Sequence, residues 1–140
     1  MFMEEVPKCF QQVEKWMSEH YLQLNPGKTE VIVFGSPAIL NELTIKGVFL
    51  NSTTCVRLSP VAKNLGVQLD SCLSFKQQVK AVKSACYLKL RNIGRMKPFL
   101  TTKQMNMLVQ AVIMSSLDYC NALYYGCNKS VVGQLQTIQN

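Results

Sequence analysis

Four cations and one tyrosine recur at helical spacing in the middle of the chain. They are Lys76, Lys80, Lys83, Tyr87 and Arg91. At about 100° per residue, a helix over 75–96 would place them along one stripe. Successive cations can neutralise successive phosphates, and an aromatic ring among them offers a face on which a base can stack. The stripe is therefore predicted to bind nucleic acid; the simpler interpretation is a solvated basic face beside an apolar one.

The chain has few residues suited to holding a metal. Its only aspartates are Asp70 and Asp118, and neither has a second acidic residue within three positions. Two-metal phosphoryl transfer needs convergent carboxylates, so we expect no such catalysis from this chain, and Asp70 is interpreted as a turn residue before a helix. The six cysteines form no Cys-x-x-Cys pair, and the one histidine, His20, is not at ligand spacing from them. No zinc site and no cofactor are predicted.

Charge is distributed unevenly along the chain. The net charge is +7, yet charged residues make up only 16% of the sequence, against roughly 25% in a typical soluble domain. Between Asp70 and Asp118 there is no acidic residue, while cations recur from Lys76 to Lys103. A block of one sign favours a polyanionic partner, either nucleic acid or an anionic membrane surface. The low charge content also suggests a surface that neighbouring polypeptide covers; a small domain rich in apolar residues is the alternative.

The sequence predicts an intracellular protein without a membrane span. Its N-terminal residues, Met-Phe-Met-Glu-Glu, are acidic and lack the apolar core of a signal peptide. The most apolar stretch, 107–117, contains Gln110 and is too short to cross a bilayer. Reduced cysteines in the cytoplasm or the nucleus are the resulting expectation.

The expected fold class is α+β, with a helix and small antiparallel strands followed by an all-helical region. Apolar residues at helical spacing from Val6 to Tyr21 predict a helix that ends before the turn signal Asn25-Pro26-Gly27. β-branched and aromatic residues predict strands over 29–34, 43–50, 53–58 and 63–69.

After Asp70 the apolar period becomes helical. Ser74 with Gln77, and Thr101 with Gln104, match the capping-box pattern, so helices are predicted over 75–96 and 102–116. The first would bury an apolar stripe made of Phe75, Val79, Val82, Cys86, Leu90 and Ile93. Shorter helices are predicted over 119–125 and 131–138. Trp16 and the methionines Met96, Met105, Met107 and Met114 are assigned to the core.

An ordered set of motifs resembles one known family. Residues 16–34, WMSEHYLQLNPGKTEVIVF, resemble the end of the palm in reverse transcriptases of LINE-type (non-LTR) retrotransposons, where a helix end containing Trp runs into L-x-L-N-x-x-K-T-E and a strand. Lys63-Asn64-Leu65-Gly66-Val67 with Leu69-Asp70 resembles the family's next motif, a β-hairpin called the primer grip. The segments that resemble the helical thumb and the region C-terminal to the thumb are Leu73-Ser74-Phe75, Leu90-Arg91 and Leu117-Asp118-Tyr119-Cys120-Asn121.

The resemblance implies the end of a palm over 1–70 and a thumb-like region over 71–140 of an RNA-directed DNA polymerase. In that family the carboxylates that bind Mg²⁺ precede this region, as do the rest of the palm and the fingers, which would be its polypeptide partners. The chain alone would therefore lack catalysis. Lys28 would be an accessory lysine near the triphosphate, although by itself it is a loop lysine. Leu65, Gly66 and Val67 would form the primer-grip-like element, and the basic stripe would contact the template–primer duplex.

Two further functions remain open. One is a sequence-independent nucleic-acid-binding module that uses the helix over 75–96. The other is an interaction protein, because this segment also resembles a basic amphipathic helix that binds calmodulin or a membrane surface. Salt-dependent binding to duplexes without lipid or calcium would favour the first function, and calcium-dependent capture by calmodulin would favour the second.

Overall fold

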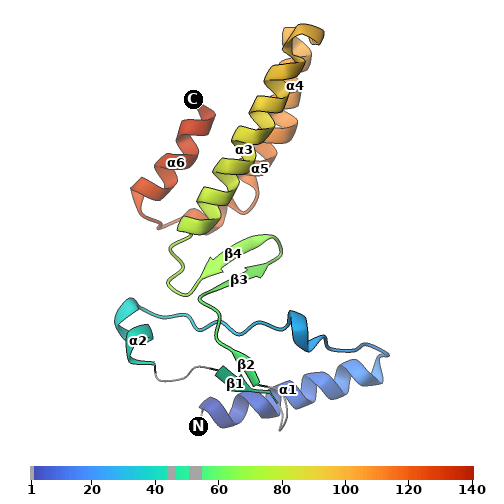
Figure 1. The fold of residues 1–140 in the computed structure, drawn as a ribbon, viewed down its shortest axis with the longest axis vertical. Coiled ribbons are helices and arrows are strands. Elements are labelled where there is room, and N and C mark those ends of the chain that lie inside the picture. The colour runs from blue at the N-terminus through green and yellow to red at the C-terminus, as the bar shows by residue number, and fades with distance from the viewer. Residues whose placement is uncertain (1, 44–46, 51–54) are drawn as a thin grey trace. The chain divides into compact units, whose positions relative to one another are not determined.

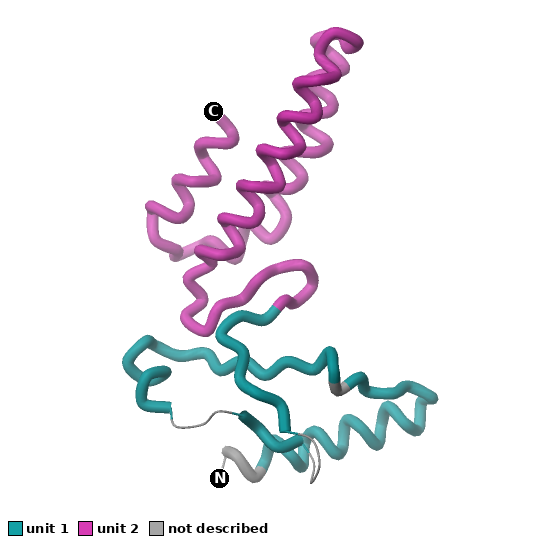
Figure 2. The backbone as a smooth tube through the Cα atoms, viewed as in Figure 1, with its two compact units in different colours: residues 1–62 teal, residues 63–140 magenta. Residues whose placement is uncertain are grey.

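The computed structural model describes residues 2–43, 47–50 and 55–140. The chain divides into two compact units, 1–62 and 63–140, which Figure 2 shows in different colours. The fold class is α+β, as predicted, with helices and two small two-stranded sheets. The change from strands to helices occurs after residue 70, whereas the division between the units falls within the first strand of the second sheet.

The first unit contains one long helix and short elements in its described part (Figure 1). The elements are α1 (Phe2–Glu19), η1 (Pro26–Lys28), α2 (Pro37–Glu42), β1 (Gly47–Phe49) and β2 (Cys55–Arg57). The helix predicted between Val6 and Tyr21 is confirmed as α1, which ends before the predicted turn.

The strand predicted over 29–34 is wrong. Val31 alone makes a β-bridge there, an isolated parallel one with Leu58. A β-branched segment becomes a strand only where neighbouring strands complete a pleated surface. In the described part of this unit, residues 29–34 have no strand partner beyond that bridge. The strands predicted over 43–50 and 53–58 are confirmed in part, because β1 and β2 pair antiparallel with Val48 opposite Val56. Residues 44–46 and 51–54 lie outside the described residues.

The first unit buries little apolar surface. Among its residues whose side chains the structure describes, Val48 and Leu50 are the buried hydrophobic ones. Several large apolar side chains are exposed instead, including Trp16, Tyr21, Phe34, Ile39 and Phe49. The assignment of Trp16 to the core is therefore wrong: its side chain is 55% exposed and stacks on His20 at 4.3 Å between ring centroids.

The second unit is a β-hairpin followed by packed helices. Its elements are β3 (Val61–Asn64, at the division between the units), β4 (Val67–Asp70), α3 (Lys76–Met96), η2 (Lys97–Phe99), α4 (Thr102–Val109), η3 (Gln110–Met114), α5 (Ser115–Asp118), η4 (Asn121–Tyr124) and α6 (Lys129–Gln139). The helices predicted over 75–96 and 131–138 are confirmed as α3 and α6. A π-helical turn, η3, interrupts the helix predicted over 102–116, and the helix predicted over 119–125 is the short 3₁₀ turn η4.

The single strand predicted over 63–69 is wrong, since β3 and β4 form a hairpin there. Leu65 and Gly66, with φ of 47° and 85°, both adopt left-handed backbone conformations. Two such residues make the type I′ turn that joins antiparallel strands. The alternation of Leu65, Val67 and Leu69 predicts a single strand with one apolar face. Leucine rarely occupies a left-handed turn position, so the local residue pattern does not indicate a turn here.

The start of α3 also differs from the prediction. The capping box of Ser74 with Gln77 is absent, because Phe75 precedes the helix with a φ of 54° and no side chain caps that end. Asp70 organises the approach instead: its carboxylate accepts hydrogen bonds from the backbone N–H groups of Cys72, Ser74 and Phe75. The second box is confirmed, with Thr101 and Gln104 each accepting from the other's backbone N–H.

The core of the second unit consists of two apolar clusters joined by α3. The first surrounds Val67, Phe75, Val79, Tyr124 and Val131, and it connects the hairpin to the start of α3 and to α6. The second surrounds Cys86, Ile93, Ile113, Leu117 and Ile138, and it connects α3 to α4–α5 and α6, which lie beside it in Figure 1. The predicted apolar stripe of α3 is confirmed: four of its members are buried, and Val82 and Leu90 are partly buried.

Candidate functional site

The basic stripe of α3 remains accessible because the apolar stripe of the same helix faces the core. Lys76, Lys80 and Arg91 are exposed, and Tyr87 is 47% exposed. Within the described residues, none of the stripe's four cations forms an ion pair with a carboxylate. Their charges are thus free to act on a solvent-side partner.

Lys83 and Tyr87 contact each other within the stripe. Lys83 is partly buried, and its Nζ lies over the Tyr87 ring at 5.9 Å from the centroid. This cation–π contact holds the positive charge against one face of the ring. A nucleic-acid base that stacked on Tyr87 would therefore use the opposite face or displace Lys83.

The hairpin turn is fastened to the helices by polar contacts. The Tyr119 hydroxyl donates a hydrogen bond to the Leu65 carbonyl oxygen. The Gln68 backbone N–H donates to Oε1 of Gln78 at 2.9 Å, and Gln78 is 4% exposed. Val67 is buried beside Val79 of α3. The structure thus brings Leu65, Gly66 and Val67 into the same unit as the basic stripe, with Leu65 exposed and Val67 in the core.

Sequence reasoning did not single out Gln78, and it included Tyr119 in the motif over 117–121 without a role of its own. Gln78 lies one residue before Val79 on the inward side of α3, and a glutamine inside an apolar stripe is a recognisable signal for a buried hydrogen bond. Tyr119 gave no local signal, because its partner Leu65 lies far away in the sequence.

A polar pocket lies beside the stripe, between β4 and α3. Its volume is about 460 Å³, and its lining includes Gln68, Gln77, Lys80 and Ser84. These side chains offer hydrogen-bond donors and acceptors next to a cation. Such a lining suits the sugar–phosphate surface of a nucleic acid.

Lys28 belongs to the first unit and takes part in none of the contacts described above. It ends the turn η1 and is exposed, and its backbone N–H donates to the Asn25 carbonyl oxygen at 3.1 Å. The Asn25 side chain accepts from Gly27, so the turn is held locally.

The carboxylates and thiols of the described residues form no cluster for a metal, and the pKa values of Asp70 and Cys86 are shifted. The residues described there bring no group of three or more His, Cys, Asp or Glu side chains together as metal ligands. Burial alone would raise the pKa of Asp70, but the hydrogen bonds from Ser74, Phe75 and Cys72 outweigh it and hold this pKa below its usual range. Burial raises the pKa of the Cys86 thiol, which disfavours the reactive thiolate.

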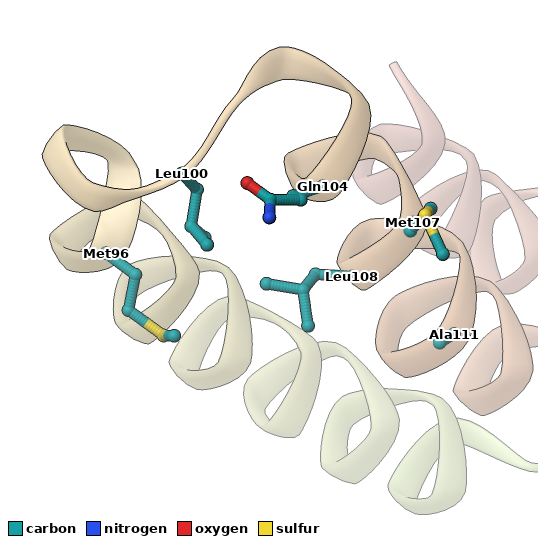
Figure 3. Close-up of a pocket in the computed structure, with 6 residues that line it drawn as sticks. All are labelled: Met96, Leu100, Gln104, Met107, Leu108 and Ala111. Atoms are coloured by element: carbon teal, nitrogen blue, oxygen red, sulfur yellow. The ribbon is translucent and has the colours of Figure 1, made fainter.

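The assignment of all four methionines to the core is wrong for two of them. Met96 and Met107 are 46% and 61% exposed, whereas Met105 and Met114 are partly buried against the second cluster. Figure 3 shows Met96 and Met107 around an apolar pocket of about 460 Å³, at the end of α3 and along α4. Leu100, Gln104, Leu108 and Ala111 complete its lining.

Comparisons of the chain with protein-family models, curated proteins and solved structures found no match. None of the helices described has both the length and the apolar character needed to cross a membrane.

Proposed function

We propose that the second unit contacts nucleic acid through the basic stripe of α3, without reading sequence, as the thumb-like part of a LINE-type reverse transcriptase. The observation that carries the proposal is the stripe itself: four cations and a tyrosine on one exposed helix face, with no carboxylate paired to them within the described residues. No acidic residue occurs anywhere between Asp70 and Asp118. Phosphates would thus meet an uncompensated positive surface.

The fold favours nucleic acid over the alternative of an amphipathic interaction helix. Calmodulin binds the apolar face of its target helix. In this protein that face of α3 forms both core clusters, through residues such as Val79, Cys86 and Ile93. Capture by calmodulin, or insertion into a membrane surface, would require the unit to open. A nucleic acid needs only the polar face that is already exposed.

The motif resemblance supports the wider setting. In that setting the chain is the end of the palm and a thumb-like region, and the Mg²⁺-binding carboxylates are supplied by polypeptide outside it. Asp70 already accepts three backbone hydrogen bonds, and the other aspartate, Asp118, is exposed. Neither side chain suits a two-metal centre. The function proposed for this chain is therefore binding rather than catalysis.

The decisive experiment is a salt series with fluorescent duplex and single-stranded oligonucleotides, read by anisotropy. Each phosphate contact contributes roughly 0.9 to the slope of log affinity against log salt for duplex DNA. Replacing Lys76, Lys80 and Arg91 with Gln should therefore flatten the slope by about 2 to 3, equally for unrelated sequences. The matched control replaces Lys97, Lys103 and Lys129, three exposed cations of the same unit outside the stripe, and should change the slope less.

Tyr87 supplies an independent readout in the same assay. If a base stacks on its ring, Tyr87→Ala weakens single-strand binding by about 1–3 kcal/mol and duplex binding by less. Tyr87→Phe keeps the ring and should bind as the unchanged protein does. A triple variant that retains the full slope would show that the stripe is a solvated face, and would end the proposal.

A further inference from the structure

A second cationic feature of α3 faces away from the stripe. Lys89 is partly buried, and its Nζ donates a hydrogen bond to Oγ of Ser116 at 2.7 Å. The two residues line a pocket of about 340 Å³ between the hairpin turn, α3 and α5. Gly66 and Tyr119 form another part of its wall, and Val82 adds an apolar surface.

The hydrogen bonds around Lys89 leave donors unused. The Ser116 hydroxyl donates to the Val112 carbonyl oxygen, so the contact with Lys89 uses a lone pair of Ser116. An ammonium group has three N–H donors, and within the described residues the other two have no partner. No carboxylate there lies within ion-pair distance of Lys89, and none lines the pocket. A partly buried charge without a counter-ion costs free energy that a bound anion would offset.

The remaining polar groups narrow the kind of anion. The hydroxyls of Ser115 and Tyr119 already donate, to the carbonyl oxygens of Ala111 and Leu65, and therefore present lone pairs to the pocket. A matching ligand carries negative oxygens for Lys89 and an O–H group for these acceptors. The monoanion of a phosphomonoester or of inorganic phosphate carries both, and for a phosphomonoester this form is present up to a second pKa near 6. An ionised carboxylate supplies the negative oxygens but no O–H group.

The backbone next to the pocket has two further unusual features. Ser115 and Ser116 directly follow the π-helical turn η3, and such turns are frequent at functional sites. Gly66 lines the pocket as well, and Leu65 before it holds a left-handed conformation that leucine rarely adopts. We propose that this pocket binds the phosphate group of a phosphomonoester or of inorganic phosphate, with Lys89 as its cation. The site is separate from the stripe and does not depend on the nucleic-acid proposal.

The test is thermal unfolding of the full chain in inorganic phosphate, against potassium chloride at equal ionic strength. A ligand that binds only the folded state raises the melting temperature, and above its Kd the rise grows with the logarithm of the ligand concentration. The unchanged protein and the control Lys103→Met should show this rise, and Lys89→Met should not. The triple variant of the stripe should also keep it, which separates this proposal from the nucleic-acid one. An equal rise in Lys89→Met, or no rise beyond that in chloride, would overturn the proposal.

Two additional measurements cover the remaining cases. If Lys89→Met does not fold, NMR of the lysine side chains in the unchanged protein replaces it. Phosphate should then shift the Lys89 signal and leave the Lys103 signal unmoved, and the reverse result rejects the site.

Oligonucleotides with a 5′-phosphate or a 5′-hydroxyl distinguish the source of the phosphate. A preference of about tenfold for the phosphorylated end, lost in Lys89→Met, assigns the pocket to strand ends. A response to inorganic phosphate without that preference assigns it to the free ion.

Discussion

At the scale of single residues, Asp70 links the end of β4 to the start of α3. Its carboxylate accepts three backbone N–H groups that would otherwise lack partners at the entrance to the helix. Because these hydrogen bonds favour the ionised form, the pKa of Asp70 is lower in the folded protein than in the unfolded chain. Asp70 therefore stabilises the fold above its unfolded pKa, near 3.8, and this contribution is lost as the pH falls through the lower, folded pKa.

Asp70→Asn should reduce the free energy of unfolding at pH 7 by about 1 kcal/mol, at the modest end of cap energies because the side chain is partly exposed. The difference from the unchanged protein should shrink as the pH falls below 4, since the native carboxyl is then protonated as well. Urea denaturation at pH 7 and pH 3 measures both values. Asp118→Asn, at an exposed aspartate, is the control and should change neither. A difference that stays constant with pH would mean that charge plays no part.

At the scale of elements, the long helices and the turn after α1 were predictable from the residue pattern, and the hairpin turn was not. Helical spacing defined α1, α3 and α6, and the Thr101–Gln104 pair defined the start of α4. The basic stripe could be predicted directly from the spacing within α3. The residue pattern missed the hairpin because Leu65 carries no turn signal, although the motif resemblance over 63–70 implied a hairpin there. The capping of α3 was missed because Asp70 acts across several residues. The Lys89 pocket forms where the hairpin turn, α3 and α5 come together, and no local sequence pattern predicts that arrangement.

The same turn predicts a stabilising substitution. A left-handed conformation costs an ordinary residue about 1 kcal/mol, and asparagine tolerates it better than leucine. Leu65 is 84% exposed, so removing its side chain gives up little burial. Leu65→Asn should raise the free energy of unfolding by roughly 0.5–1 kcal/mol, measured by chemical denaturation. Gly66→Ala, at a φ of 85°, should act in the opposite direction. Destabilisation by Leu65→Asn would show that the leucine side chain packs in solution.

At the scale of the whole molecule, the two units differ in how much apolar surface they bury. The second has two core clusters, whereas the described part of the first buries Val48 and Leu50 and exposes larger side chains. This contrast fits the expectation, drawn from the low charge content, of a surface that other polypeptide covers. Exposed apolar patches of this kind favour association.

We therefore expect the chain to self-associate at tens of micromolar, through its first unit. Replacing Trp16, Tyr21 and Phe34 with serine should shift sedimentation toward the monomer. The matched variant replaces Leu88, Phe99 and Tyr125, exposed residues of the second unit, and should shift it less. A sharp monomer boundary for the unchanged protein would contradict the expectation and identify a self-sufficient domain.

The π-helical turn η3 sets the rotational phase between the two ends of one helix. An α-helix completes a turn in about 3.6 residues, and a π-turn takes up one residue more. α5 is thereby rotated by roughly 100° from where an uninterrupted α4 would place it. Met107 precedes η3 and Ala111 lies within it, and both line the apolar pocket of Figure 3. Ser116 follows η3 and accepts the hydrogen bond from Lys89. An uninterrupted α-helix with the same number of residues would turn Ser116 away from Lys89. Removing one residue from Gln110–Met114 would restore a regular helix and keep Ser116 in phase with Lys89, so the π-turn absorbs the residue that would otherwise separate the two side chains.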